Sequence, residues 1–287
     1  MKLPGANDPS VGRFLSVPIC ELPLLLSGVA PGDPPVDERA HIRMQADIEL
    51  RPGLSDGHGR LDTGAAIAIL DNAGGFTAGL ASLPDGWVVT TNLRYRRIAA
   101  IPTSTSVATA SILRRGSRAV VTEIEFVTEG ARWAEGILTS AVLPPEGGVP
   151  EWERPVRMNR AALTVEESTE PFWDWIGVVV EDDAPLEGRI EVAAKHRNPW
   201  GIVHGGVGPA ALAGLIERAH PGHLVVDASL HYLAPVRVGP LRVTAHALSQ
   251  HADGYLYEVN VFDEGADARC CVTGTMLARE VPAGLPK

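Results

Sequence analysis

The chain has 287 residues, enough for two ordinary domains. Lys and Arg number 25 against 35 Asp and Glu, and the formal charge of −10 argues against nucleic acid or an anionic membrane as the main partner. Apolar residues make up 45% of the chain, which excludes a disordered composition.

The first segment, residues 1–35, is rich in proline and is predicted to form an irregular N-terminal arm. Its longest apolar run, 22–30, is short and contains Pro23, so we expect neither a membrane-spanning helix nor a signal peptide. A cytoplasmic protein follows as the expectation. A second segment rich in Pro and Gly, at 144–160, is predicted to be a linker between an N-terminal unit (36–143) and a C-terminal unit (161–287).

The two units repeat one another. Residues 61–64 (Leu-Asp-Thr-Gly) match 203–206 (Val-His-Gly-Gly) at a shift of 142 residues, and 92–95 match 229–232 at a shift of 137. A later match, of 129–130 with 264–265, has a shift of 135. The shift falls steadily because the first unit has a longer connection after its helix. Two copies of one unit explain this order better than chance.

Each unit has the same predicted elements: a strand, a Gly-rich loop, a long helix and then four extended segments. The helices are predicted over 63–75 and from about 206–208 onwards, and both are apolar on every face, which is typical of a buried helix. Alternation of inward and outward residues predicts half-buried antiparallel strands at 88–97, 104–114, 119–128, 132–143, 224–233, 239–249, 255–263 and 268–279. One helix against many strands makes the fold class α+β.

The segment from Asn198 to Gly206, Asn-Pro-Trp-Gly-Ile-Val-His-Gly-Gly, resembles the Asn-x-x-Gly-x-x-His-Gly-Gly signature of hotdog-fold acyl-CoA thioesterases of the phenylacetate-pathway (PaaI-like) type. The resemblance covers nearly the whole chain, taken as two tandem hotdog units. It implies that each unit wraps an antiparallel sheet around a long central helix, and that the units pack as a pseudo-dimer with sites at their interface.

In that family an acidic residue follows the signature His by nine positions. In the C-terminal unit this position is Ala213, whereas the matching count from Asp62 in the N-terminal unit reaches Asp71. Because the two helices of a family dimer are related by a two-fold axis, the resemblance implies one composite site made of Asp71, Asn198, His204 and Gly205. The other combination, Asp56, Asp62 and Thr63 with Ala213, lacks a base and is predicted to be a decayed site.

The expected roles follow from the chemistry of a thioester. The Gly205 N–H, at a helix N-terminus, suits the oxyanion that develops on the carbonyl. Asn198 is expected to donate a second hydrogen bond, and Asp71 to act as general base or as nucleophile. His204 is expected to orient the loop, and Thr91, or its neighbour Thr90, to position water.

Substrate binding is assigned to Gly206 and to Arg114, Arg115 and Arg118. The segment 114–118 (Arg-Arg-Gly-Ser-Arg) resembles the family's Arg-x-Gly-Arg hairpin, and guanidinium groups suit the phosphates of CoA. The alternatives are structural. The arginines are equally typical of a solvated hairpin tip, and Asp71 of a buried polar contact. Asn198 and His204 also fit a tight turn, and Asp62 an N-cap.

Three functions compete: acyl-CoA hydrolysis, enoyl-CoA hydration, and acyl-CoA binding without catalysis. Asn198-Pro199 resembles part of a hydratase loop, but His196 stands where that loop has aspartate. The three cysteines, Cys20, Cys270 and Cys271, form neither a disulfide framework nor a zinc pattern, so we expect no metal and no cofactor. The expected partner is an acyl-CoA substrate, and association into a homo-oligomer is left open.

Overall fold

The computed structural model describes residues 43–48, 50, 52–82, 86–144, 170–198 and 201–281. The predicted N-terminal arm lies outside the described residues, as does the predicted linker apart from Pro144. The limits of the two units therefore stay predictions, and the elements on either side of the gap define the fold.

The elements follow one another in the order predicted for a repeat. The first unit holds β1 (Arg43–Ile48), α2 (Thr63–Ser82), β2 (Trp87–Arg97), β3 (Ser106–Arg115), β4 (Ala119–Thr128) and β5 (Ala131–Leu143). The second holds α3 (Phe172–Ile176), β6 (Val178–Glu181), β7 (Ala184–Ile190), α4 (Val207–Ala219), β8 (His223–Tyr232), β9 (Leu241–His251), β10 (Gly254–Asp263) and β11 (Arg269–Glu280). Three-residue 3-10 helices lie at Pro52–Leu54, Ala194–His196 and Glu264–Ala266.

The helix of the first unit is longer than the sequence predicts, because it continues through Gly74 and Gly75 to Ser82. Burial explains this continuation. A Cβ on Gly74 would lie within 3.0 Å of side-chain atoms of Thr122, Ile124 and Leu138, so the glycine lets the helix lie directly on the sheet. The short elements α3 and β6 are absent from the sequence prediction.

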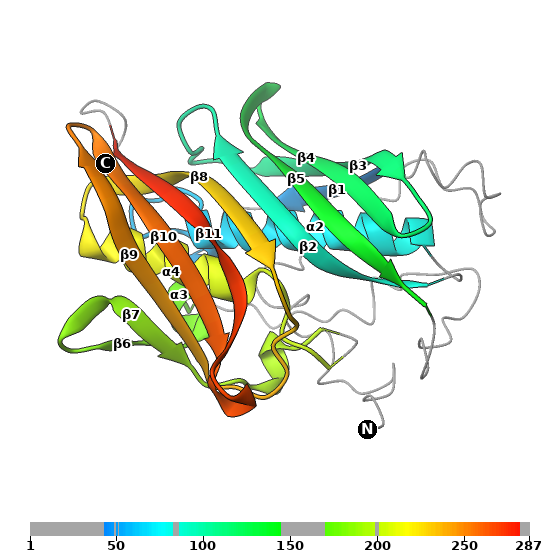
Figure 1. Ribbon diagram of the computed structural model, residues 1–287. Helices are drawn as coiled ribbons and strands as arrows, with labels where there is room; N and C mark the ends of the chain where they lie inside the picture. Colours follow the sequence, from blue (N-terminus) through cyan, green and yellow to red (C-terminus); the bar gives the residue numbers. More distant parts are fainter. Residues whose placement is uncertain are drawn as a thin grey trace.

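The described strands form one eleven-stranded sheet in the order β1-β3-β4-β5-β2-β8-β11-β10-β9-β7-β6, and every neighbouring pair is antiparallel. The units join where β2 pairs with β8, and there Leu93 faces Leu230. These two leucines are equivalent in the repeat, so a pseudo-two-fold axis passes between them. Figure 1 shows the sheet curving around α2 and α4.

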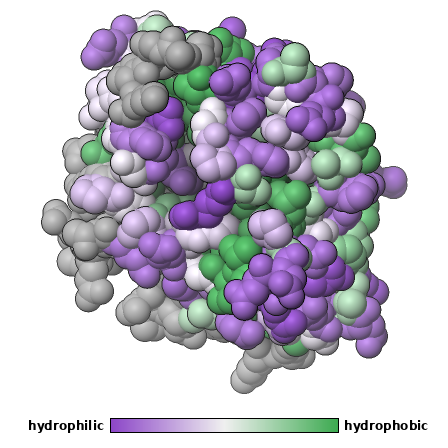
Figure 2. Space-filling view, turned by 90° about the vertical axis from the view of Figure 1, so that its left-hand side faces the viewer, coloured by the Kyte–Doolittle hydropathy of each residue, from purple (hydrophilic) through white to green (hydrophobic). Residues whose placement is uncertain are grey.

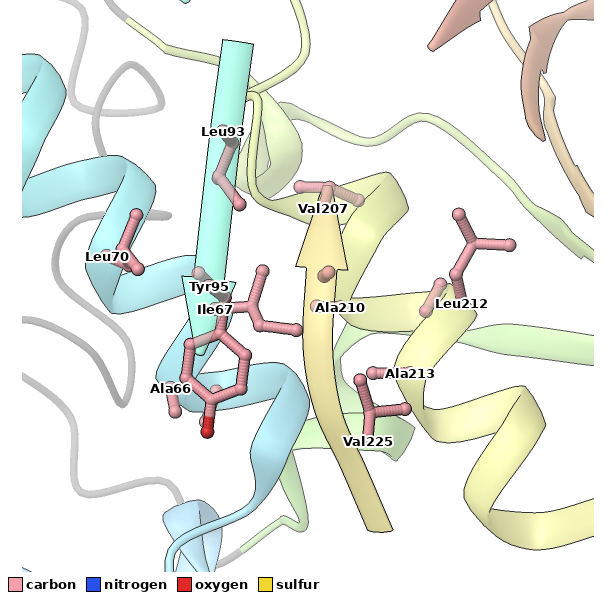
Figure 3. Packing of buried hydrophobic residues seen from close by; sticks show 14 of the residues in the cluster. Ala66, Ile67, Leu70, Leu93, Tyr95, Val207, Ala210, Leu212, Ala213 and Val225 are labelled. Atoms are coloured by element: carbon pink, nitrogen blue, oxygen red, sulfur yellow. The ribbon is translucent and has the colours of Figure 1, made fainter. Parts of the chain in front are cut away.

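The two helices touch at positions that the same axis relates. A Cβ on Gly64 would lie 2.8 Å from the carbonyl oxygen of Ala210, and a Cβ on Gly206 would lie 2.7 Å from Cα of Ala68. Gly64 and Gly206 are equivalent in the repeat, as are Ala68 and Ala210. Small residues therefore set the close approach of the helices, and one hydrophobic core runs through both units (Figure 3). The predicted α+β class and paired arrangement are confirmed.

Polar side chains cover most of the face in Figure 2, with apolar ones gathered in a narrow patch among them. Such a surface is ordinary for a folded protein in water. Within the described ranges, no helix is both long and apolar enough to cross a membrane.

Candidate active site

The loop before α4 is closed by backbone hydrogen bonds. The Asn198 N–H donates to the carbonyl of Ile202 at 2.9 Å, and the His204 N–H donates to the carbonyl of His196 at 2.8 Å. Gly201 takes a left-handed conformation, with φ of 74°, that other residues rarely adopt. This turn delivers Gly205 to the N-terminus of α4, where backbone N–H groups and the helix dipole favour negative charge.

Asp71 of α2 lies against this N-terminus. A Cβ placed on Gly205 would be 2.9 Å from both carboxylate oxygens of Asp71, although the two residues come from different units. Asp71 is only 4% exposed, and a buried carboxylate is costly unless it has hydrogen-bond donors. The Asp71 carboxylate and the backbone N-terminus of α4 therefore lie side by side, in the composite arrangement that the family resemblance implies.

Two side chains bind the Asp71 carboxylate. The Thr90 hydroxyl donates to Oδ1 at 2.8 Å, and Nδ1 of His204 lies 3.0 Å from Oδ2. The Gly206 N–H also points at the same Nδ1, at 3.3 Å. Since a protonated ring nitrogen cannot accept, we assign its proton to the shorter contact with Asp71. Thr90 of the first unit thus binds one oxygen of Asp71, and His204 of the second unit binds the other.

Tyr232 fixes the peptide that follows Gly205. Its hydroxyl donates to the Gly205 carbonyl at 2.9 Å. Burial, and then the charge of Asp71, raise the pKa of Tyr232 well above its usual value, which keeps the hydroxyl a donor. Among the described residues, none accepts a hydrogen bond from the Gly205 N–H. That N–H is therefore available to a ligand oxygen.

A cavity of about 470 Å³ opens beside these groups. Asp71, Thr90, Asn198, His204, Gly205 and Tyr232 line its polar end. The rest of the wall is mostly apolar, formed by α2, the start of β2 and the segment 233–236. Gly75 and Gly79 follow Asp71 at intervals of four on the same face of α2, and the absence of side chains there leaves room along the helix.

Thr91 lines the cavity beside Thr90, but its hydroxyl does not bind Asp71. Its hydroxyl donates to the carbonyl of Thr139 at 3.0 Å. The pairing of β2 with β5 shifts register between Thr90 and Asn92, and this bulge turns Thr90 toward Asp71 instead. Of the two threonines, Thr90 is therefore the one whose hydroxyl binds Asp71, and the positioning of water by either stays a prediction.

Gly206 and Arg115 have structural contacts. Gly206 packs on Ala68 and does not line the cavity. The Arg115 Nε donates to the carbonyl of Ala81 at 2.7 Å and so stabilises the C-terminal end of α2; its contact with CoA stays a prediction. Arg114 and Arg118 are exposed and lie outside the cavity wall; their contact with CoA stays a prediction.

Sequence reasoning missed Tyr232. Tyr95 occupies the equivalent position in the first unit, but its hydroxyl has no hydrogen-bond partner among the described residues, so the recurrence of tyrosine in the repeat does not reveal the contact of Tyr232 with Gly205. The described residues include no group of three or more His, Cys, Asp or Glu side chains that could hold a metal ion.

The other helix N-terminus differs. The Ala65 N–H donates to Oδ1 of Asp62 at 2.9 Å, so Asp62 caps α2 as the structural alternative predicted. Asp56 accepts a hydrogen bond from Nε of Arg60 at 2.7 Å. Glu217, one turn beyond Ala213, is a carboxyl that the sequence reading did not assign. Burial, and then the nearby Asp62, raise its pKa to about 8.

The comparisons with known proteins agree with this geometry. Residues 194–278 match the family described as the acyl-CoA thioesterase N-terminal domain, and this segment carries Asn198, His204 and Gly205. No curated protein matches the chain in a sequence search.

Solved structures match most of the chain at low sequence identity. A proposed thioesterase II from Thermobifida fusca is 17% identical, with 89% of this chain and 100% of that chain covered and a TM-score of 0.58. An acyl-ACP thioesterase from Bacteroides thetaiotaomicron is 13% identical, with 86% and 100% covered and a TM-score of 0.58. The tesB protein of Mycobacterium avium subspecies paratuberculosis is 11% identical, with 95% and 100% covered and a TM-score of 0.57.

These matches establish the fold as a double hotdog. The narrower expectation of a phenylacetate-pathway type is not supported, because the matching structures are of the thioesterase II and tesB kinds.

Proposed function

We propose that this double hotdog chain, whose residues 194–278 match an acyl-CoA thioesterase family, hydrolyses acyl-CoA or a related acyl thioester at one composite site. The observation that carries the proposal is the approach of Asp71, from α2, to Gly205 at the N-terminus of α4. An acid beside an unoccupied amide donor is what acyl transfer to water requires.

The thioester carbonyl would lie with its oxygen at the Gly205 N–H. The helix N-terminus stabilises the negative charge that develops on this oxygen in the transition state. Asn198 lines the same end of the cavity and is the second donor in this proposal. The acyl chain would extend along the glycine face of α2, past Gly75 and Gly79, because that wall is open and apolar.

Two routes use these groups. In the first, Asp71 takes a proton from water as the water oxygen attacks the carbonyl carbon; the C–S bond then breaks, and the thiolate receives that proton. In the second, an oxygen of Asp71 attacks the carbonyl carbon and expels the thiolate, and water hydrolyses the resulting anhydride. In both routes Thr90 and His204 hold the carboxylate in place.

Hydration of enoyl-CoA gains no support from the site. His196, at the position of the hydratase aspartate, is buried and does not line the cavity. Its Nδ1 accepts a hydrogen bond from the Ala193 N–H at 3.0 Å, and burial lowers its pKa to about 4. His196 therefore has a structural contact in place of access to substrate.

The test is release of free thiol from acyl-CoA or acyl carrier protein, followed with a chromogenic thiol reagent. We expect Asp71→Asn to lower kcat by about 10²–10⁴-fold, the usual contribution of a general base. Glu217→Gln, which neutralises the carboxyl near the other helix N-terminus, is the matched control and should retain turnover. Full activity of Asp71→Asn would overturn the proposal. Thermal stabilisation of the wild-type protein by acyl-CoA with no thiol released would instead indicate a binding module.

A further inference from the structure

A second cavity, of about 420 Å³, lies where the pseudo-two-fold axis places the counterpart of the first. Residues 224 and 226–227 of β8 line it, as 87 and 89–90 of β2 line the first cavity, and residues 96–99 correspond to 233–236. The fold therefore builds the same hollow twice, once on each side of the junction between β2 and β8.

The two cavities differ in charge at several equivalent positions. Thr90 and Arg237 of the first cavity correspond to Asp227 and Ala100 of the second, and three further positions carry an arginine in the second cavity alone. Ile202, Leu233 and Ala234 line the first cavity. Their counterparts in the second cavity are Arg60, Arg96 and Arg97, and Arg279 of β11 adds a fourth guanidinium. Guanidinium groups in a partly apolar hollow are costly unless they meet negative charge, so their partners decide what the cavity can bind.

Three of the four arginines have carboxylate partners. Arg60 lies 2.7 Å from Asp56, Arg96 lies 3.3 Å from Asp227, and Arg279 lies 3.6 Å from Asp253. Of the four guanidinium groups, only that of Arg97 has neither a hydrogen bond nor an ion pair with any of the described residues.

Arg97 is partly withdrawn from water, and burial lowers its pKa. It interacts electrostatically with Glu217, a carboxyl whose pKa is raised by burial to about 8 and which is therefore mostly protonated at neutral pH. It also interacts with Tyr95, whose fully buried hydroxyl has no hydrogen-bond partner in the described part of the chain. Figure 3 shows Tyr95 on the inner side of β2, between the strands and α2. One cation and one hydroxyl are thus left without bonded partners in the same region.

Apart from Asp227, which pairs with Arg96, the rest of the wall is apolar. It is formed by Ile98, Ile101, Leu224, Val226, Leu277 and Val281. We propose that this second cavity binds an organic carboxylate with an apolar body, with the carboxylate on the Arg97 guanidinium and the body against these side chains. A planar guanidinium pairs with a carboxylate through two parallel hydrogen bonds.

The charge balance selects a carboxylate over a phosphate. One unpaired guanidinium matches a single negative charge, whereas a phosphate monoester carries nearly two and would have to compete for arginines that already have partners. The acid released by thioester hydrolysis is of this class, but binding at Arg97 does not require that the chain be a hydrolase.

The test is calorimetric titration of decanoate, decyl phosphate and decanol into the full chain. We expect decanoate to bind more tightly than either of the others. Arg97→Met should weaken the binding of decanoate in the second cavity by about tenfold or more, and this is the Arg97-dependent binding event. Leu277→Trp, which fills the cavity from β11, should have the same effect. Arg132→Met is the matched control, because Arg132 is an exposed arginine on β5 paired with Glu125, and it should bind decanoate as the wild type does.

Unchanged decanoate binding in both Arg97→Met and Leu277→Trp would overturn the proposal, as would tighter binding of decyl phosphate than of decanoate. The same titration in Asp71→Asn separates this proposal from the proposed hydrolysis. That variant should keep the Arg97-dependent binding event, whether or not the wild type releases thiol.

Discussion

The loops that precede α2 and α4 have the same backbone and different side chains. In the first, the Asp56 and Asp62 N–H groups donate to the carbonyls of Arg60 and Leu54, just as Asn198 and His204 donate to Ile202 and His196 in the second. Gly59 and Gly201 share the same φ of 74°.

The chemistry of the two loops, 54–64 and 196–206, diverges because most of their side chains differ. His204 and Gly205 in one loop are replaced by Asp62 and Thr63 in the other. Asp62 supplies its own carboxylate to the N-terminus of α2, whereas the N-terminus of α4 receives Asp71 from the opposite unit. The Asp62 carboxylate accepts a hydrogen bond from the N-terminus of its own helix. Asp71 instead reaches the N-terminus of α4 from the opposite unit, and the Gly205 N–H there stays available to a substrate.

The largest effect after loss of Asp71 is expected at Gly205. A methyl group there would lie 2.9 Å from both oxygens of Asp71, so Gly205→Ala must displace the carboxylate or the loop. We expect kcat/KM to fall by about 10²-fold, comparable to the loss of one oxyanion donor. Thiol release measures the change.

Thr63→Ala is the matched control for Gly205→Ala, because Thr63 is the equivalent residue of the other loop. It should leave turnover within about twofold of the wild type, because Thr63 does not line the cavity that holds Asp71. Equal losses in the two variants would contradict the assignment of catalysis to one side only.

A smaller effect is expected from the two neighbouring threonines of β2. Thr90→Val removes the hydroxyl that donates to Asp71 and should lower kcat about tenfold, the worth of one hydrogen bond to a charged group. Thr91→Val removes a hydroxyl that bonds to Thr139 and should change kcat much less. Steady-state kinetics of the pair, with thermal melting to check folding, decides between them. A larger loss in Thr91→Val would contradict the geometry of the bulge.

The smallest effect concerns stability rather than turnover, and it arises from Glu217, whose counterpart in the other helix is Gly75. Burial and Asp62 raise the pKa of Glu217 from 4.5 to about 8, and burial raises that of Asp62 from 3.8 to about 6. Such carboxyls favour the folded state when protonated, so their contribution to stability is full at low pH and is lost as pH rises to about 8.

Glu217→Gln stays neutral and keeps an oxygen that can accept from the Val225 N–H, which lies 2.9 Å from the Glu217 carboxyl. The difference in Tm between variant and wild type should therefore grow by roughly 3–6 °C in favour of the variant from pH 5 to pH 9. Parallel melting curves across this range would contradict the placement of Glu217.

Much of this fold could be predicted from the sequence because the repeat and the alternation of strand residues are local patterns. The C-terminal end of α2 could not, since Gly74 and Gly75 destabilise an isolated helix, whereas in this fold Gly74 packs directly on the sheet. The bulge that turns Thr90 rather than Thr91 toward Asp71 depends on the pairing of β2 with β5, which is not a local pattern. The arginines of the second cavity likewise come together from three segments that are far apart in the sequence.

The approach of Asp71 to Gly205 was predictable because the family resemblance implies an acid nine positions after the signature His, and the shift of 142 residues carries that position from Ala213 to Asp71. Tyr232 and Glu217 were not, because their importance lies in contacts with backbone groups and carboxyls from elsewhere in the chain.

The most direct measurement of cooperation between the units is a double-mutant cycle on kcat/KM for Asp71→Asn and His204→Gln. If the two side chains act as one group, the double variant should be no slower than Asp71→Asn alone, to within about threefold. Losses that multiply would show that the carboxylate of the first unit and the loop of the second act independently, which would contradict a composite site.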